Sequence, residues 1–162
     1  MREPAARVAD IYRRHAASVH RRALRLLGDD AEAHEVLQDL FVSLLERPEQ
    51  YAGASAVTTF LYSATTHACL NRMRNQRNRE RLLQEQGVPN EVLQASDAPL
   101  QVRKVLARMP RELAEVAVYY FVDEMSHQEI AGLLGCSRRH VGNLVDRVLA
   151  WGRAEEEACS AS

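Results

Sequence analysis

Apolar residues recur at helical spacing through most of the chain, and no stretch alternates as a β-strand would. In the first segment, Val8, Ile11 and Val19 fall on one face of a helix expected from about Ala5 to Leu27. Gly28 is expected to end this helix because glycine readily takes the left-handed conformation at a helix C-terminus. The pattern therefore predicts an all-α fold.

Two further helices are expected before residue 86. Asp29 or Asp30 is suited to cap the second helix, Glu32 is placed for a capping box, and Pro48 should stop it. Its apolar stripe consists of Val36, Leu37, Leu40, Phe41, Leu44 and Leu45. The third helix is expected from about Val57 to Gln84, apolar at first and rich in arginine in its second half.

The helical pattern dissolves between Gln86 and Pro99, where glycine, proline, asparagine, serine and aspartate concentrate. One helical turn at Val92–Leu93 is the regular feature expected there. We therefore predict two small helical domains, at 5–85 and 100–155, joined by a flexible linker over 86–99. The second domain should contain helices at about 100–108 and 110–122, followed by two short helices.

The last two helices have the spacing of a helix-turn-helix. Ser126 and Glu129 form a capping-box signature. Ala131 supplies the small side chain needed where two helices cross, and Gly135 can take the positive φ needed in the turn. The other expected core residues are Ile130, Leu134, Cys136, Val141 and Leu144. The alternative is an ordinary helical hairpin with a solvated surface.

The solvent face of the last helix is basic. Ser137 is expected to cap this helix, and its exposed residues should be Arg138, Arg139, His140, Asn143 and Arg147. Arginine and asparagine can pair bidentately with base edges in the major groove, and further arginines can bind phosphates. The face therefore suits duplex DNA.

The net charge of −1 conceals a strong segregation of charge. Residues 29–49 carry seven acids against one arginine, residues 72–81 five arginines against one acid, and residues 138–153 four arginines against one acid. The acidic helix could dock a basic protein surface. The interleaved Arg and Asn of residues 66–79, which follow Phe60 and Tyr62, suit single-stranded nucleic acid. Each of these two charge runs could also be an ordinary solvated face.

Other classes of protein are disfavoured. No apolar run approaches the roughly 18 residues that a membrane helix needs, and the charged N-terminus lacks the apolar segment of a secretory signal. Cys69, Cys136 and Cys159 form no CxxC pair, the six histidines show no metal-ligand spacing, and no catalytic motif occurs. We expect a cytoplasmic protein without enzymatic activity, cofactor or metal.

In their order and spacing, these parts resemble a sigma factor of RNA polymerase, of the extracytoplasmic-function (ECF) group in the sigma-70 family. Ala33–Phe41 is similar to the acidic stretch of region two, and Phe60-Leu61-Tyr62 stands where the family usually has Trp-Leu-Tyr. Leu106–Pro110 resembles the opening of region four, and Ser126–Ala131 its S-x-x-E-I-A motif. The resemblance covers residues 8–153.

The resemblance implies partners for each part of the chain. Core polymerase would be contacted at its β′ clamp helices and its β flap, and region four would read the −35 element. The β′ clamp helices would contact Glu35, Gln38, Asp39 and Phe41. The −10 element would be melted, and its bases flipped and held, by Ser55, Thr58, Phe60, Tyr62, His67, Asn71, Arg72, Arg74 and Arg77. The −35 contacts would be Ser137, Arg138, Arg139, His140, Asn143 and Arg147.

The resemblance also implies that an anti-sigma factor holds such a protein inactive. The sequence departs from the family at Phe60, where Trp is usual, and at Gly142 and Leu144, where a basic residue is commoner. We expect the missing basic side chains at Gly142 and Leu144 to weaken the contacts with DNA phosphates. Two alternatives stay open: a helix-turn-helix regulator that binds duplex DNA without polymerase, and a sigma-like adaptor that does not bind DNA.

Overall fold

The computed structural model describes residues 3–51, 56–87 and 98–162 of the chain. Within these ranges the regular structure is entirely helical, which confirms the predicted all-α class. The chain divides into two compact units, Met1–Lys104 and Val105–Ser162. None of the described helices is both long and apolar enough to span a membrane.

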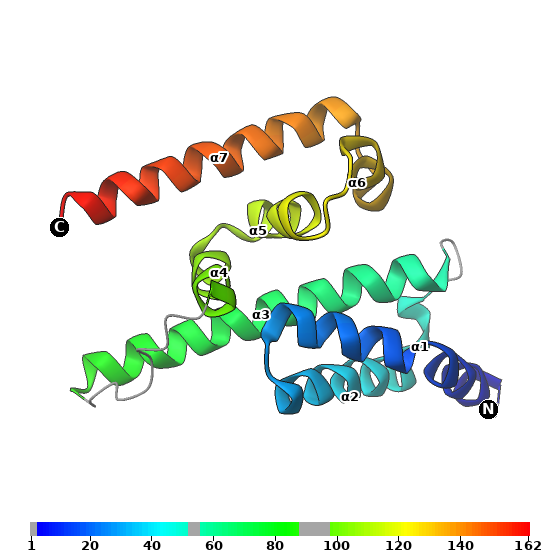
Figure 1. Ribbon diagram of the computed structural model, residues 1–162. Helices are drawn as coiled ribbons and strands as arrows, with labels where there is room; N and C mark the ends of the chain where they lie inside the picture. Colours follow the sequence, from blue (N-terminus) through cyan, green and yellow to red (C-terminus); the bar gives the residue numbers. More distant parts are fainter. Residues whose placement is uncertain (1–2, 52–55, 88–97) are drawn as a thin grey trace. The chain divides into compact units, whose positions relative to one another are not determined.

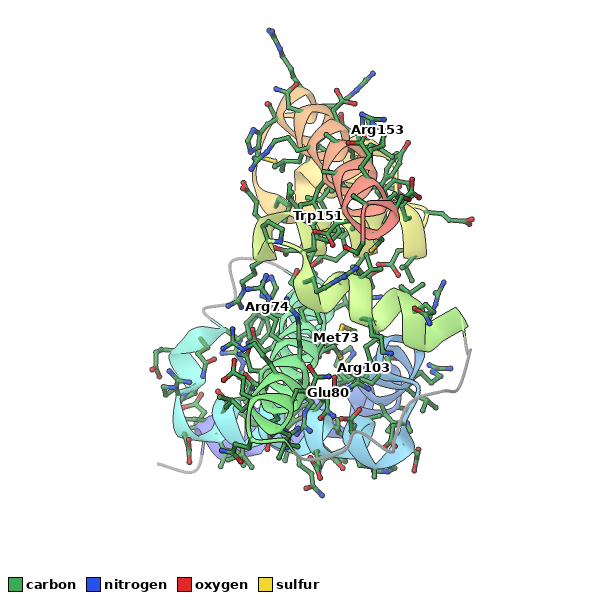
Figure 2. The ribbon with its side chains drawn as sticks, turned by 90° about the vertical axis from the view of Figure 1, so that its left-hand side faces the viewer. Met73, Arg74, Glu80, Arg103, Trp151 and Arg153 are labelled. Carbon is green, nitrogen blue, oxygen red and sulfur yellow. The ribbon has the colours of Figure 1, made fainter. Side chains whose placement is uncertain are left out.

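In the first unit, α1 (Glu3–Leu27) and α2 (Asp30–Glu46) form a hairpin that packs against α3 (Val57–Glu85) (Figure 1). α2 ends just before Pro48, which was expected to stop it, and a short 3-10 turn, η1 (Pro48–Gln50), follows. The side chain of Met73, labelled in Figure 2, is 1% exposed. One core cluster of this unit consists of Val8, Val19, Leu37, Leu40, Phe41, Leu44 and Leu61.

Local signals set the helix ends where they were expected. Gly28 has a φ of +71°, and its N–H donates to the Leu24 carbonyl at 2.8 Å. Asp29, rather than Asp30, is the cap of α2, because its carboxylate accepts from the Glu32 N–H at 2.9 Å. The Glu32 carboxylate binds Arg103 instead of completing the expected capping box.

Arg103 ties the beginning of α4 (Ala98–Arg108) to the α1–α2 corner. Its guanidinium donates to the two Glu32 carboxylate oxygens at 2.7 and 3.1 Å and to the Leu27 carbonyl at 3.0 Å. The side chain is only 14% exposed. Helix α4 begins two residues inside the predicted linker. The turn expected at Val92–Leu93 lies outside the described residues.

The second unit contains α5 (Arg111–Ala117), η2 (Val118–Val122), α6 (His127–Leu134) and α7 (Arg138–Ser160). The helix expected over 110–122 is observed as α5 followed by η2, which is a π-helical turn. In this turn the Asp123 N–H donates to the Val118 carbonyl at 3.0 Å. The prediction of two short final helices is wrong for α7, which has 23 residues. Beyond Val148 its residues include three Ala and three Glu, which favour helix, and none of the residues in these last turns is fully buried.

Candidate nucleic-acid and protein interfaces

The exposed side of α2 combines acids with apolar side chains. Glu35, Gln38 and Asp39 are exposed along one face. Val42 and Leu45 continue it, with 51% and 53% of their surface exposed. Leu44 and Leu45 were both expected in the core, but of the two only Leu44 is buried, with 3% of its surface exposed. This face, which we call the α2 surface, consists of Glu35, Gln38, Asp39, Val42 and Leu45.

The Phe41 side chain belongs to the core and not to the α2 surface. It is 5% exposed, and its ring meets the Tyr12 ring edge-on with centroids 4.9 Å apart. The prediction that Phe41 contacts polymerase is therefore corrected: its helical position, next to Leu40 in the apolar stripe, places it in the core.

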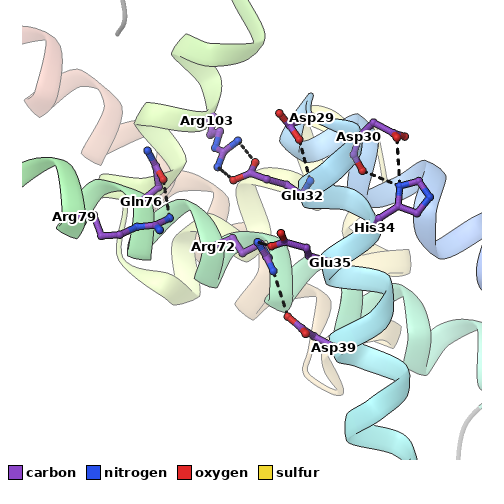
Figure 3. Close-up of polar contacts among 10 residues, drawn as sticks. All are labelled: Asp29, Asp30, Glu32, His34, Glu35, Asp39, Arg72, Gln76, Arg79 and Arg103. Atoms are coloured by element: carbon purple, nitrogen blue, oxygen red, sulfur yellow. Dashed lines mark hydrogen bonds and ion pairs between the residues drawn. The ribbon is translucent and has the colours of Figure 1, made fainter. Parts of the chain in front are cut away.

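Arg72 of α3 links the acidic and basic parts of the first unit (Figure 3). Its Nη1 is 2.7 Å from Glu35 Oε2, and its Nη2 is 3.2 Å from Asp39 Oδ2. Burial works to lower the pKa of Arg72, but the hydrogen bonds to Glu35 and Asp39 outweigh it and raise that pKa. One residue predicted to bind DNA and two predicted to bind protein thus form a single ion-pair network.

An open groove of about 550 Å³ runs beside this network, between α2 and α3. Asn71, another residue predicted to bind the −10 element, lines this groove and is exposed. The remaining lining residues are Glu32, Val36, Asp39, Ala68, Arg72, Asn75 and Arg79. The groove therefore offers carboxylates and guanidinium groups together, rather than a purely basic channel.

The residues predicted to bind the −10 element do not all lie on one face of α3. Phe60, His67, Asn71 and Arg74 do, at relative positions i, i+7, i+11 and i+14. Phe60 also packs against the core, with its ring 5.5 Å from that of Tyr51. Arg77 is exposed on a different side. Ser55 lies outside the described residues.

Tyr62 and Thr58 face α1, where they line a pocket of about 260 Å³. The Arg22 guanidinium lies 3.6 Å from the centroid of the Tyr62 ring and donates to Thr66 Oγ1 at 2.8 and 3.1 Å. One face of the Tyr62 ring is therefore covered by a cation. Arg22 was not singled out from the sequence, since no local motif marks it. The other lining residues are His15, Ser18, Val19, Leu61 and Thr65.

The N-terminus of α6 and the turn between α6 and α7 form as the sequence predicts. The Ser126 N–H donates to Glu129 Oε2 at 2.7 Å, and the Glu129 N–H donates to Ser126 Oγ at 3.2 Å. The backbone hydrogen bond from Ser126 lowers the pKa of the Glu129 carboxyl, aided by the Ser126 side chain. Gly135 has a φ of +67°. Leu134 and Cys136 are half-buried rather than fully in the core.

On α7, Arg139, His140, Asn143 and Arg147 are exposed and share the face opposite the buried Val141, Leu144 and Val145. We call these four residues the α7 surface. Arg138 is exposed at its flank, and Ser137 Oγ accepts from the His140 N–H at 3.1 Å.

Glu112 of α5 lies beside the α7 surface and was not predicted. Its Oε2 is 3.4 Å from Arg147 Nη1, and its Oε1 is 4.0 Å from His140 Nε2. Glu112 thus lies within ion-pair distance of two of the surface's four polar side chains.

Of the two departures in α7 from the family pattern, packing explains Leu144, whereas a side chain at Gly142 would meet only ordinary van der Waals contacts. Leu144 is 2% exposed, so a basic residue there would have to be buried. Gly142 is half-buried, and a Cβ at this position would lie 3.8 Å from His127 Nδ1. Neither position belongs to the α7 surface, so their lack of charge does not reduce its basic character.

One cluster of metal-ligand type also occurs in the first unit. His20, Asp30 and His34 come together where α1 meets α2, although they are separated in the sequence. The spacing of the histidines gave no sign of this cluster, because it forms by the packing of two helices.

Comparison with known proteins identifies the family. Residues 11–79 match Sigma-70 region 2, and residues 100–151 match Sigma-70, region 4. The two matches, of 69 and 52 residues, together cover more than half of the 162-residue chain. The chain belongs to the sigma-70 family. This confirms the resemblance found in the sequence.

A relative of this sigma-70 family member is the ECF RNA polymerase sigma factor SigE of Mycolicibacterium smegmatis. The two are 22% identical over 147 residues, which make up 85% of this chain and 57% of that protein. The chain therefore spans little more than half the length of this curated relative. The region 2 match lies within the first unit, and the region 4 match covers most of the second.

Proposed function

We propose that this chain is an ECF-type sigma factor that directs RNA polymerase to specific promoters in the cytoplasm. The observation that carries the proposal is the presence of both sigma-70 regions, each with an exposed surface of suitable chemistry. As a specificity subunit, it would catalyse no reaction itself. Promoter choice would come from its contacts with DNA, and chemistry from the core enzyme.

The α2 surface is the proposed contact for the β′ clamp helices. Exposed apolar side chains beside acids are typical of a protein-docking surface, since apolar area contributes affinity and charge sets orientation. Val42 and Leu45 therefore join Glu35, Gln38 and Asp39 in the proposed interface. A contact between the second unit and the β flap is proposed on the resemblance alone, as is an anti-sigma factor that would cover these surfaces.

The outer face of α3 is the proposed site for the melted −10 strand. His67, Asn71 and Arg74 would contact the strand, with Arg77 at the side and Phe60 anchoring the beginning of the helix. The pocket lined by Thr58 and Tyr62 would receive a flipped base, for which the α1 residues supply the opposite wall. Arg72 would hold α2 against α3 rather than bind DNA, since both of its ion-pair partners lie on α2.

The α7 surface is the proposed reader of the −35 duplex. A helix-turn-helix places the first part of its second helix in the major groove, and Arg139, His140 and Asn143 lie there. Arg138 and Arg147 would contact phosphates at the edges of the groove. Ser137 would keep its N-cap role and present its backbone to the DNA.

The central experiment is run-off transcription with purified core polymerase on a promoter library. We expect transcripts that depend on the added chain and share −10 and −35 sequences. A folded chain that supports no transcript would contradict the proposal. Promoter binding by the chain in the absence of core polymerase, with no transcript, would instead support the independent helix-turn-helix regulator.

The docking surface can be tested without disturbing the Arg72 network. The double variant Val42→Glu/Leu45→Glu places charge on the α2 surface and leaves Glu35, Asp39 and Arg72 intact. We expect at least tenfold weaker binding to core polymerase with unchanged helical content. The matched control is Leu82→Glu, which changes an equally exposed leucine near the end of α3. Equal losses in both variants would contradict the assignment.

The duplex-reading surface is tested by Arg139→Ala and Asn143→Ala. Each should cost about 1–3 kcal/mol of discrimination if the side chain pairs with a base, and should shift −35 preference in the promoter library. The control, Arg153→Ala, removes an exposed arginine further along α7. Unchanged preference with reduced affinity would show phosphate contacts, and unchanged binding would favour the adaptor without DNA binding.

A further inference from the structure

Three side chains of metal-ligand type meet at the corner between α1 and α2. His20 lies two turns before the end of α1, Asp30 is the first residue of α2, and His34 follows one turn later. One ring nitrogen of each histidine and one carboxylate oxygen all lie within 4.8 Å of one another. The two imidazole rings are 4.3 Å apart between centroids. Two imidazoles and a carboxylate form a donor set that binds zinc and related metals.

The distances to Asp30 already approach those of a coordinated ion. Asp30 Oδ1 is 3.0 Å from His20 Nε2, and Oδ2 is 3.3 Å from His34 Nδ1. Ligands at 2.0–2.1 Å from a tetrahedral zinc ion are about 3.4 Å apart. The side chains of His34 and Asp30 are 54% and 68% exposed, so they can make the remaining adjustment by rotation.

The two histidines differ in how they are held. His34 Nδ1 lies 2.9 Å from the Asp30 carbonyl oxygen (Figure 3). The same Nδ1 is the ring nitrogen that faces Asp30 Oδ2, so His34 would bind the ion through Nδ1 and give up its contact with the carbonyl. His20 Nε2 is shielded from solvent and makes no hydrogen bond of good geometry within the described chain. Such a nitrogen costs free energy unless its lone pair is satisfied.

We propose that His20, Asp30 and His34 bind one divalent transition-metal ion of the zinc class, with solvent at the remaining position. Magnesium and calcium do not suit this site as the bound ion, since both prefer oxygen donors. The bound ion joins α1 to the first turn of α2, the helix that carries the α2 surface. The site therefore stabilises the first unit, and it is independent of promoter recognition.

The test uses the full-length chain, made metal-free and carrying Cys159→Ser so that the exposed thiol does not bind metal. Zinc is titrated by calorimetry, and thermal unfolding is measured with and without it. We expect one equivalent of zinc to bind with micromolar affinity or better, and the unfolding temperature of the first unit to rise by about 5 °C. Magnesium should have no effect.

Single variants locate the site. His20→Gln, Asp30→Asn and His34→Gln should each weaken zinc binding at least tenfold and remove the thermal shift. The matched control is His15→Gln, which changes another histidine of α1 that lines the separate Tyr62 pocket. Far-ultraviolet circular dichroism shows whether each variant keeps its helices. Absence of zinc binding by the parent chain, or equal binding by the parent and the three variants, would overturn the proposal.

Discussion

Arginine serves different purposes in the two units. In the first, Arg22, Arg72 and Arg103 each reach a neighbouring helix, where they contact an aromatic ring, carboxylates or a backbone carbonyl. In the second, Arg139 and Arg147 lie on an exposed helix face, and Glu112 is the acid beside it. Both units are arginine-rich in sequence, but the three arginines named in the first unit pack against other groups, whereas those of the α7 surface lie on one exposed helix face.

The difference follows from how each helix is packed. α3 contacts α1 and α2, and α7 contacts α5 and α6, but the buried residues of α3 spread over a wider part of its circumference than those of α7. The first part of α7 covers a core on one side, which leaves the opposite side free to present Arg139, His140 and Asn143 together. A charge run thus predicts an exposed charged surface more safely on a helix whose buried residues form a narrow stripe than on one whose buried residues spread around it.

The largest expected difference between the units concerns their cysteines. Burial raises the pKa of the Cys69 thiol to about 12, although Arg22, Arg72 and Arg103 work to lower it. We expect Cys69 to react with a thiol reagent at least 100-fold more slowly than the exposed Cys159 in the folded chain at pH 8. Mass spectrometry of labelled peptides measures both rates, with the half-buried Cys136 as an intermediate reference.

The same shift predicts how stability changes with pH. The thiol in the unfolded chain ionises near its ordinary pKa of 9.0, whereas the folded chain holds it neutral to about 12. The contribution of Cys69 to stability is therefore full below pH 9 and is lost as the pH rises toward 12. Cys69→Ala should flatten this alkaline loss in urea unfolding curves. An unchanged slope would mean that Cys69 is not the group responsible.

The second prediction compares two ion pairs of one helix. Arg103→Ala should destabilise the first unit by about 2 kcal/mol, because it leaves Glu32 and the Leu27 carbonyl without a largely buried partner. Arg108→Ala is the matched control, since its pair with Glu155 in the second unit is more exposed, and it should cost under about 0.5 kcal/mol. Chemical denaturation measures both. Similar losses of stability in the two variants would contradict the expected difference between the two ion pairs.

The third prediction concerns Arg72. Arg72→Ala should cost about 1 kcal/mol of stability, a value reduced for the exposure of Glu35 and Asp39. Arg147→Ala in the second unit should cost almost none. If Arg72→Ala instead leaves stability unchanged and abolishes binding to a melted −10 strand, then Arg72 contacts DNA and does not hold α2 against α3.

The smallest expected effect concerns Glu112, the acid beside the α7 surface. Glu112→Gln should strengthen binding of the polymerase complex to duplex promoter DNA about two- to threefold at low salt, because it releases Arg147 and His140. The gain should shrink as salt is added. Glu156→Gln, at an exposed position near the end of α7, provides the control. An equal gain from both variants would indicate a general charge effect.

The predictions from sequence succeeded where the cause is local and failed where it is not. Gly28, Asp29, Ser126, Gly135 and Ser137 end or begin helices as expected, since capping depends on residues three or four positions away. Leu45 was misplaced because an apolar stripe wider than the buried face leaves its edges undecided. The stripe placed Phe41 in the core correctly, and its contact with polymerase was expected only from the resemblance. The length of α7 was missed because its last turns have no apolar stripe to mark them.

The sequence by itself determined the all-α class, the order of the two sigma-70 regions and the residues available on α7. These follow from periodicity, capping and spacing, which act within one helix or one turn. Only the tertiary structure decided that Arg72 pairs with Glu35 and Asp39, that Arg22 covers Tyr62, and that His20 meets Asp30 and His34. Each of these contacts joins two helices, and the rotation of one helix against another is set by how the core packs.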